Sequence, residues 1–183
     1  PTEKRVVKVM KDSDGLWQLT VDGQPFYVNG AATNKFYYET SKFGDNAIRL
    51  YSPTASNTKE IMDAAYQANL MVYLGLGMAA AESFDYSNAE KVAAQKERII
   101  GHVKQYMHHP ALLCWSLGNE IEASNDSNAA LWKAVGELAD TIRAMDADHP
   151  ITCALAGSGT EKIEDALTAQ MTMKKVLVVI AAI

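Results

Sequence analysis

Two kinds of apolar pattern alternate along the chain: short unbroken runs, and longer stretches in which apolar residues recur at helical spacing. The short runs predict buried strands, and the spaced stretches predict amphipathic helices. We expect strands at residues 5–10, 16–21, 25–29, 47–51, 70–76, 112–117, 151–156 and 176–183. We expect helices at residues 35–43, 57–69, 87–108, 131–145 and 160–170.

Turn and cap residues support these boundaries. Asp12-Ser13-Asp14-Gly15 predicts the turn of a hairpin between the first two strands. Ser87 and Glu90 form a capping-box pattern, with Ser87 as the expected cap of the long helix. Beyond the hairpin, strand and helix alternate, which predicts parallel βα units.

Two architectures fit this α/β alternation: an open doubly wound sheet and a (β/α)₈ barrel. The spacing of the elements does not choose between them. Neither a Gly-x-Gly-x-x-Gly nor a Gly-x-x-x-x-Gly-Lys motif follows the first strand, which argues against a nucleotide-binding fold.

Composition excludes some classes of protein. The 183 residues suffice for one domain, and the 48% hydrophobic and 21% charged fractions are ordinary for a globular protein. A net charge of −5 argues against nucleic acid as a partner, because phosphates call for a basic surface. No apolar stretch reaches the ~18 residues that a membrane helix requires. No signal peptide is recognised and the sequence begins at Pro1 rather than Met, so localisation stays open.

The candidate chemistry lies directly after the apolar run 112–117. This run ends in Gly118-Asn119-Glu120, so a buried strand delivers an amide and a carboxylate at its C-terminal end. Sites in α/β folds lie at this end of the strands.

Four segments carry a resemblance to a known family. The stretch HHPALLCWSLGNE at 108–120 resembles the fourth barrel strand of retaining glycoside hydrolases of clan A, and most closely of family 2. GLWQLTVDGQPFYVNG at 15–30, FGDNAIRLY at 43–51 and DADHPIT at 146–152 resemble the first, second and fifth strand regions of the same barrels. The similarity covers roughly residues 4–170.

The resemblance implies a partial (β/α)₈ TIM barrel with five to six parallel strands, preceded by an N-terminal β-hairpin. We expect three parts: the hairpin at 1–24, the partial barrel at 25–170 and an atypical apolar tail at 171–183. A full barrel usually takes ~250 residues, so the resemblance implies a barrel truncated after its fifth or sixth strand.

The resemblance also implies roles for individual residues. Glu120 would be the general acid/base, and Asn119 would contact the sugar 2-hydroxyl. Arg49, at the end of the second strand, would help to organise the catalytic carboxylates, with a salt bridge to Glu120. The other candidates for substrate binding are the aromatic residues Tyr51, Phe84 and Tyr86.

A retaining mechanism needs a second carboxylate, and the sequence offers no candidate nucleophile. Glu122 lies too close along the same loop, and the carboxylates of the helices fit solvated positions. One hypothesis is a glycosidase that acts only when a partner completes the barrel. The alternative is a non-catalytic module that binds carbohydrate or associates with itself.

Expectations about partners follow from the same picture. Open sheet edges template pairing with other chains, so we expect a homo-oligomer, most simply a dimer, with the run 176–183 at its interface or tucked back as a sixth strand. We expect no cofactor and no metal, because His108, His109 and His149 precede strands at the barrel's bottom face, where residues serve stability. Cys114 and Cys153 are interpreted as buried free thiols.

Overall fold

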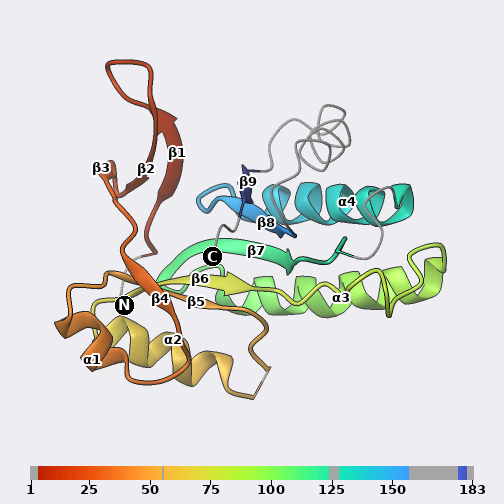
Figure 1. The fold of residues 1–183 in the computed structure, drawn as a ribbon, viewed down its shortest axis with the longest axis horizontal. Coiled ribbons are helices and arrows are strands. Elements are labelled where there is room, and N and C mark those ends of the chain that lie inside the picture. The colour runs from red at the N-terminus through yellow and green to blue at the C-terminus, as the bar shows by residue number, and fades with distance from the viewer. Residues whose placement is uncertain (1–3, 55, 124–127, 157–176, 181–183) are drawn as a thin grey trace.

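The computed structural model describes residues 4–54, 56–123, 128–156 and 177–180. These residues form two sheets, one antiparallel with three strands and one parallel with six (Figure 1). The predicted helix at 160–170 lies outside the described residues. No helix among the described ones is long and apolar enough to cross a membrane.

The antiparallel sheet comprises β1 (Val7–Lys11), β2 (Trp17–Val21) and β3 (Gln24–Pro25). Strands β1 and β2 pair from Val7↔Val21 to Lys11↔Trp17, which confirms the predicted hairpin. In its turn, Asp12 Oδ1 accepts hydrogen bonds from the backbone N–H groups of Asp14 and Leu16, both at 2.9 Å. The carboxylate thus satisfies backbone groups that the tight reversal leaves free.

The parallel sheet runs in chain order. Its strands are β4 (Gly30–Ala32), β5 (Ala47–Leu50), β6 (Met71–Gly75), β7 (Leu112–Asn119), β8 (Ile151–Leu155) and β9 (Leu177–Ile180). Each strand pairs with the next, so the order never reverses. A doubly wound sheet reverses its order at a switch point, whereas a barrel does not. The prediction of a partial barrel is confirmed, and the run near the C-terminus supplies its sixth strand.

The predicted strand at 25–29 is wrong over most of its length. Residues 26–29 lie between β3 and β4 and belong to neither sheet. The Asn46 side chain bonds two of their backbone groups: its Oδ1 accepts from the Asn29 N–H at 2.9 Å, and its Nδ2 donates to the Tyr27 carbonyl at 2.7 Å. A side chain thus replaces the strand partner that the apolar pattern suggested.

Four helices follow strands of the parallel sheet within the described residues. They are α1 (Tyr37–Lys42), α2 (Thr58–Gln67), α3 (Ala89–Tyr106) and α4 (Ala129–Met145). The expected capping box is wrong, because Asn88 caps α3 by accepting from the Lys91 N–H at 3.1 Å. The Ser87 hydroxyl instead donates to Asp85 at 2.6 Å.

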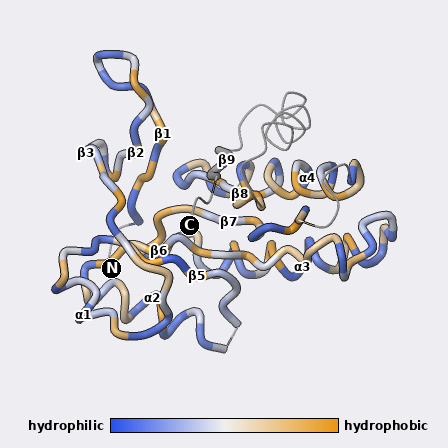
Figure 2. The backbone as a smooth tube through the Cα atoms, viewed as in Figure 1, coloured by the Kyte–Doolittle hydropathy of each residue, from blue (hydrophilic) through white to orange (hydrophobic). Residues whose placement is uncertain are grey.

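The main core lies between the helices and the parallel sheet. Its largest fully buried side chains include Trp115, Tyr106, Met62 and Ile99. Figure 2 shows β7 as largely hydrophobic and the tip of the hairpin as hydrophilic. A second, smaller core joins Val7 and Val21 to residues near the starts of the parallel strands: Ala47, Met71 and Leu113. The base of the antiparallel sheet therefore packs against the bottom end of the partial barrel, and Figure 1 shows the rest of the hairpin projecting away from it.

A buried polar network at this bottom face connects the N-terminal segment to the barrel. Asp146 accepts hydrogen bonds from Trp115 Nε1 at 2.8 Å and from His149 Nδ1 at 2.7 Å, and it pairs with Lys4 at 3.1 Å. Burial alone would raise the pKa of Asp146, but the hydrogen bonds from His149, Trp115 and Lys4 outweigh it and hold that pKa well below its usual range. His149 thus has a structural role, as expected of its position.

His109 is also occupied by protein groups. Its Nδ1 accepts from the Ala111 N–H at 3.1 Å, so its Nε2 carries the proton and donates to Asp63, also at 3.1 Å. In the part of the chain that the structure describes, no three His, Cys, Asp or Glu side chains are grouped so as to hold a metal ion.

Candidate active site at the C-terminal end of strand β7

Asn119 and Glu120 lie where β7 leaves the core. The strand is buried from Leu112 to Gly118, and Asn119 is its first exposed residue. Glu120 then turns the chain with φ of 51°, in the left-handed region, while its N–H donates to the Ala154 carbonyl at 2.9 Å. The amide and the carboxylate are therefore presented together at the end of the sheet where α/β folds carry their sites.

Gly118 is required by the packing under this turn. A Cβ added there would lie 2.5 Å from Cγ2 of Ile121, whose side chain is 2% exposed. The Ile121 side chain fills the space next to the Gly118 backbone and packs the turn against the main core. The Gly-Asn-Glu sequence thus combines one steric requirement with two exposed polar groups.

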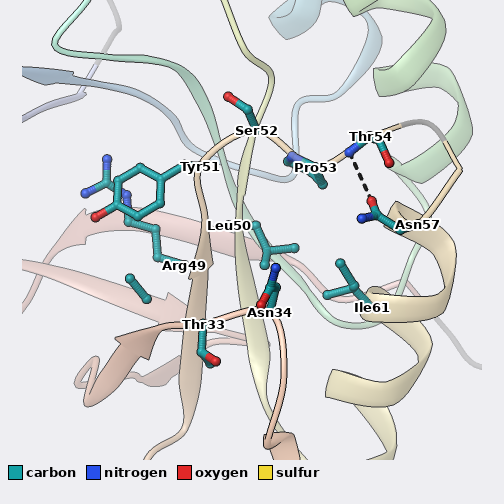
Figure 3. Close-up of a pocket in the computed structure, with 11 residues that line it drawn as sticks. Thr33, Asn34, Arg49, Leu50, Tyr51, Ser52, Pro53, Thr54, Asn57 and Ile61 are labelled. Carbon is teal, nitrogen blue, oxygen red and sulfur yellow. Dashed lines mark hydrogen bonds between the residues drawn. The ribbon is translucent and has the colours of Figure 1, made fainter.

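Arg49 reaches this site from β5. Its Nη2 donates to Asn119 Oδ1 at 2.8 Å, and its guanidinium lies 4.4 Å from the ring centroid of Tyr51 and 5.1 Å from that of Tyr73. Figure 3 shows Arg49 beside Tyr51. The expected salt bridge to Glu120 is wrong, since among the described residues Glu120 takes part in no ion pair and Arg49 bonds to Asn119. Glu120 departs from the strand direction with a positive φ, whereas Asn119 is still part of the strand.

A pocket of about 410 Å³ opens at the ends of β4 and β5 next to Arg49. Figure 3 shows its polar side chains and the hydrogen bond from the Thr54 N–H to Asn57 Oδ1, at 2.9 Å. The hydroxyl and amide groups that line it belong to Thr33, Asn34, Tyr51, Ser52, Thr54 and Asn57. Such groups suit the hydroxyls of a sugar, and Arg49 contributes a charged group to this lining.

A second, larger cavity of about 610 Å³ lies on the interior face of the sheet. Its walls are mainly apolar, with Leu19, Val28, Tyr73 and Leu113 among them, and Arg49 borders it as well. Among the residues that the structure describes, no aspartate or glutamate lines either pocket, and Glu120 itself lies outside both linings. The described residues therefore do not place the carboxylate pair of a retaining glycosidase around either pocket.

Phe84 and Tyr86, the other aromatic candidates, belong to the loop after β6 and are turned toward the main core. Their rings lie 4.7 Å apart in the loop after β6, and they pack against the main core. Tyr86 is 5% exposed, and its hydroxyl donates to the Ala79 carbonyl at 2.5 Å. This burial favours anchoring of the loop over contact with a sugar.

Sequence reasoning assigned no supporting role to three residues near the site: Tyr73, Thr152 and Glu122. Tyr73 stands opposite Arg49 in the pairing of β5 with β6, so strand alternation could have placed it there. The Tyr73 hydroxyl bonds the Thr152 hydroxyl at 2.5 Å, which fixes the ring against the guanidinium. Glu122 is the third, a fully buried carboxylate that no pattern in the sequence distinguishes from an exposed one.

The two cysteines are buried free thiols, as expected. Burial raises the pKa of Cys153 to about 12 and that of Cys114 still further. Both thiols are therefore protonated at neutral pH, and neither is a nucleophile.

The sequence model of the family described as "Glycosyl hydrolases family 2, TIM barrel domain" matches residues 57–178, most of the chain. The chain belongs to this family. The glycoside hydrolase fold and the partial barrel expected from the sequence are thus confirmed.

Relatives of this family 2 domain are glycosidases. A β-galactosidase of Leuconostoc mesenteroides is 24% identical over 173 residues, which cover 84% of this chain and 16% of the relative. A mannan endo-1,4-β-mannosidase A of Podospora anserina is 31% identical over 74 residues, which cover 40% of this chain and 20% of the relative. The family 2 domain therefore corresponds to a small part of each relative's length.

Solved structures show the same fold. A β-glucuronidase of Bifidobacterium dentium, complexed with coumarin-3-O-glucuronide, superposes with a TM-score of 0.66 at 16% identity, over 86% of this chain and 27% of that one. A family 2 member from Bacteroides cellulosilyticus gives a TM-score of 0.65 at 16% identity, over 97% of this chain and 27% of that one.

Proposed function

We propose that this family 2 domain carries the acid/base part of a retaining glycosidase site for β-linked sugars. In this proposal Glu120 is the general acid/base and Asn119 contacts a sugar hydroxyl, with Arg49 and Tyr51 beside them. The observation that carries the proposal is the 2.8 Å hydrogen bond from Arg49 Nη2 to Asn119 Oδ1. A guanidinium can only donate, so the amide oxygen faces it and the amide N–H groups of Asn119 remain to donate to a ligand.

The chemistry that this half of the site supplies is proton transfer. A glycosidic oxygen leaves as a hydroxyl when an adjacent carboxylic acid protonates it, and in retaining enzymes a second carboxyl about 5–5.5 Å away attacks the anomeric carbon. In the described part of the chain, no second carboxylate lines a pocket near Glu120. We therefore propose that the 183-residue chain on its own binds sugar weakly and turns over little or none.

A turnover assay on aryl β-glycosides tests this proposal. The expected result is a rate close to background for the 183-residue chain, unchanged in Glu120→Gln. Glu137→Gln is the matched control, because Glu137 is an exposed carboxylate of α4 that pairs with Lys133 at 3.9 Å. Robust hydrolysis that disappears in Glu120→Gln and persists in Glu137→Gln would contradict the proposed lack of turnover.

Self-association is a second candidate function, and the apolar interior cavity of about 610 Å³ favours it. Large exposed apolar surfaces mark interfaces, and the outer edge of β4 pairs with no strand among the described residues. A homodimer that covers these features would sediment as one species. Val28, which lines the cavity and is 53% exposed, gives the test. Val28→Asp should yield monomer, whereas Leu16→Asp on the hairpin turn should not; a wild-type monomer at high concentration would rule the dimer out.

A further inference from the structure

The turn that carries Glu120 is bound to the elements on both of its sides. Toward β8, the Glu120 N–H donates to the Ala154 carbonyl at 2.9 Å. Toward the loop after β6, the Ala81 N–H donates to the Ile121 carbonyl at 2.7 Å. These contacts use backbone groups only, so they do not depend on which side chains follow Glu120.

Glu122 adds a contact that does depend on its side chain. Its Oε1 accepts a hydrogen bond from the Ala156 N–H at 2.5 Å, directly beyond the end of β8. The residue is 0% exposed. The carboxylate thus ties the far end of the turn to β8, two residues beyond the contact that Glu120 makes with Ala154.

Stability alone does not explain a carboxylate at this position. A buried charge costs free energy unless it is paired or fully hydrogen-bonded. Glu122 Oε2 is buried and has no hydrogen-bond partner among the described residues, and Glu122 forms no ion pair there. A buried group left partly unsatisfied next to a candidate acid calls for a functional reason.

The conformation of Glu120 supplies that reason. Its φ of 51° is strained for a residue with a side chain, and such strain persists only where neighbouring contacts impose it. The contacts of Glu120 and Glu122 with β8 lie on either side of the strained backbone and hold it. We propose that Glu122 is a positioning residue that keeps the Glu120 turn in this conformation, a role that rests on the proposed function of Glu120.

Three substitutions at Glu122 test the proposal. Glu122→Gln keeps an acceptor for the Ala156 N–H, Glu122→Met removes it, and Glu122→Asp keeps the charge but shortens its reach. The exposed Glu137→Met serves as the control. Three quantities are measured: amide exchange at Glu120 by NMR, hexose-induced shifts at Asn119, and the thermal midpoint.

We expect Glu122→Met and Glu122→Asp to accelerate exchange of the Glu120 amide by about 10- to 100-fold, the loss of a charge-assisted hydrogen bond. The hexose shifts at Asn119 should disappear in both. In Glu122→Gln, the exchange rate of the Glu120 amide and the hexose shifts at Asn119 should stay at their wild-type values. Glu137→Met should change neither quantity. The thermal midpoint of Glu122→Met should stay within a few degrees of the wild type, because the removed charge offsets the lost bond.

Two results would overturn the proposal. Wild-type exchange at Glu120 in both Glu122→Met and Glu122→Asp would show that Glu122 does not hold the turn. A fall in thermal midpoint with faster exchange throughout β7 and β8 would show an ordinary structural role. A wild-type protein without hexose shifts would contradict the proposed function instead, and the exchange rates would still decide the role of Glu122.

Discussion

Substitution of Asp146 gives the sharpest test of how the hairpin is joined to the barrel. Its buried carboxylate accepts hydrogen bonds from Trp115, His149 and the Asp148 N–H at 2.7–3.1 Å, in addition to the Lys4 pair. Asp146→Ala leaves the buried Trp115 and His149 donors without their acceptor, while Lys4 keeps Asp148 at 3.1 Å. Breaking a buried pair costs ~3–5 kcal/mol, and Asp146→Asn, which retains one oxygen, should cost ~1–3 kcal/mol.

The pH dependence of stability follows from the lowered pKa of Asp146. Because the folded-state pKa lies below that of the unfolded chain, the carboxylate stabilises the fold above about pH 4. This stabilisation is lost progressively as pH falls from there toward the folded-state pKa. Asp146→Asn should therefore show a weaker loss of stability between about pH 4 and pH 2 than the wild type.

Urea unfolding followed by tryptophan fluorescence measures both effects, because unfolding exposes the buried Trp115 and Trp132. The free energy of unfolding at pH 7 and its slope between pH 4 and pH 2 should both be reduced in Asp146→Asn. If Asp146→Ala is unfolded in buffer, Asp146→Asn alone decides the result. An Asp146→Ala protein within 1 kcal/mol of the wild type, or an unchanged acid slope in Asp146→Asn, would refute the reasoning.

Three further predictions concern the site and the thiols. Gly118→Ala brings a Cβ to 2.5 Å from Cγ2 of Ile121, so it should destabilise by about 1–3 kcal/mol in urea unfolding and shift the NMR signals of the turn; an unchanged spectrum would contradict the packing. Arg49→Met removes the bond to Asn119, so hexose shifts at Asn119 should vanish while the midpoint of unfolding changes little. Cys114 and Cys153, with pKa values raised by burial, should react with a thiol reagent at pH 8 only after unfolding, and rapid labelling of the native protein would contradict their burial.

Much of the fold could be predicted because its strands are buried and its helices amphipathic. The run 112–117 and the helical spacing at 131–145 each require one type of element, and β7 and α4 confirm both. The pattern failed at 26–29, where the Asn46 side chain bonds the backbone in place of a neighbouring strand. Hydrophobic periodicity does not indicate where a side chain, rather than a neighbouring strand, will bond the backbone.

The site was predictable in its position and less so in its contacts. Strand ends brought Arg49 and Asn119 together as expected, but the choice of Asn119 over Glu120 as the partner of Arg49 depends on the positive φ of Glu120. Tyr86 and Glu122 are buried by the packing of loops, and loop packing leaves no periodic signal in the sequence.

The central claim is that Asn119 and Glu120 form a sugar-binding site with Arg49. Titration of the 183-residue chain with common hexoses, followed by NMR, tests it most directly, because a few polar contacts correspond to ~4 kcal/mol and millimolar affinity. We predict saturable shifts of the Asn119 side-chain amide and the Glu120 backbone amide that are lost in Asn119→Ala. Shifts confined to residues far from Glu120, or identical shifts in Asn119→Ala, would contradict the account.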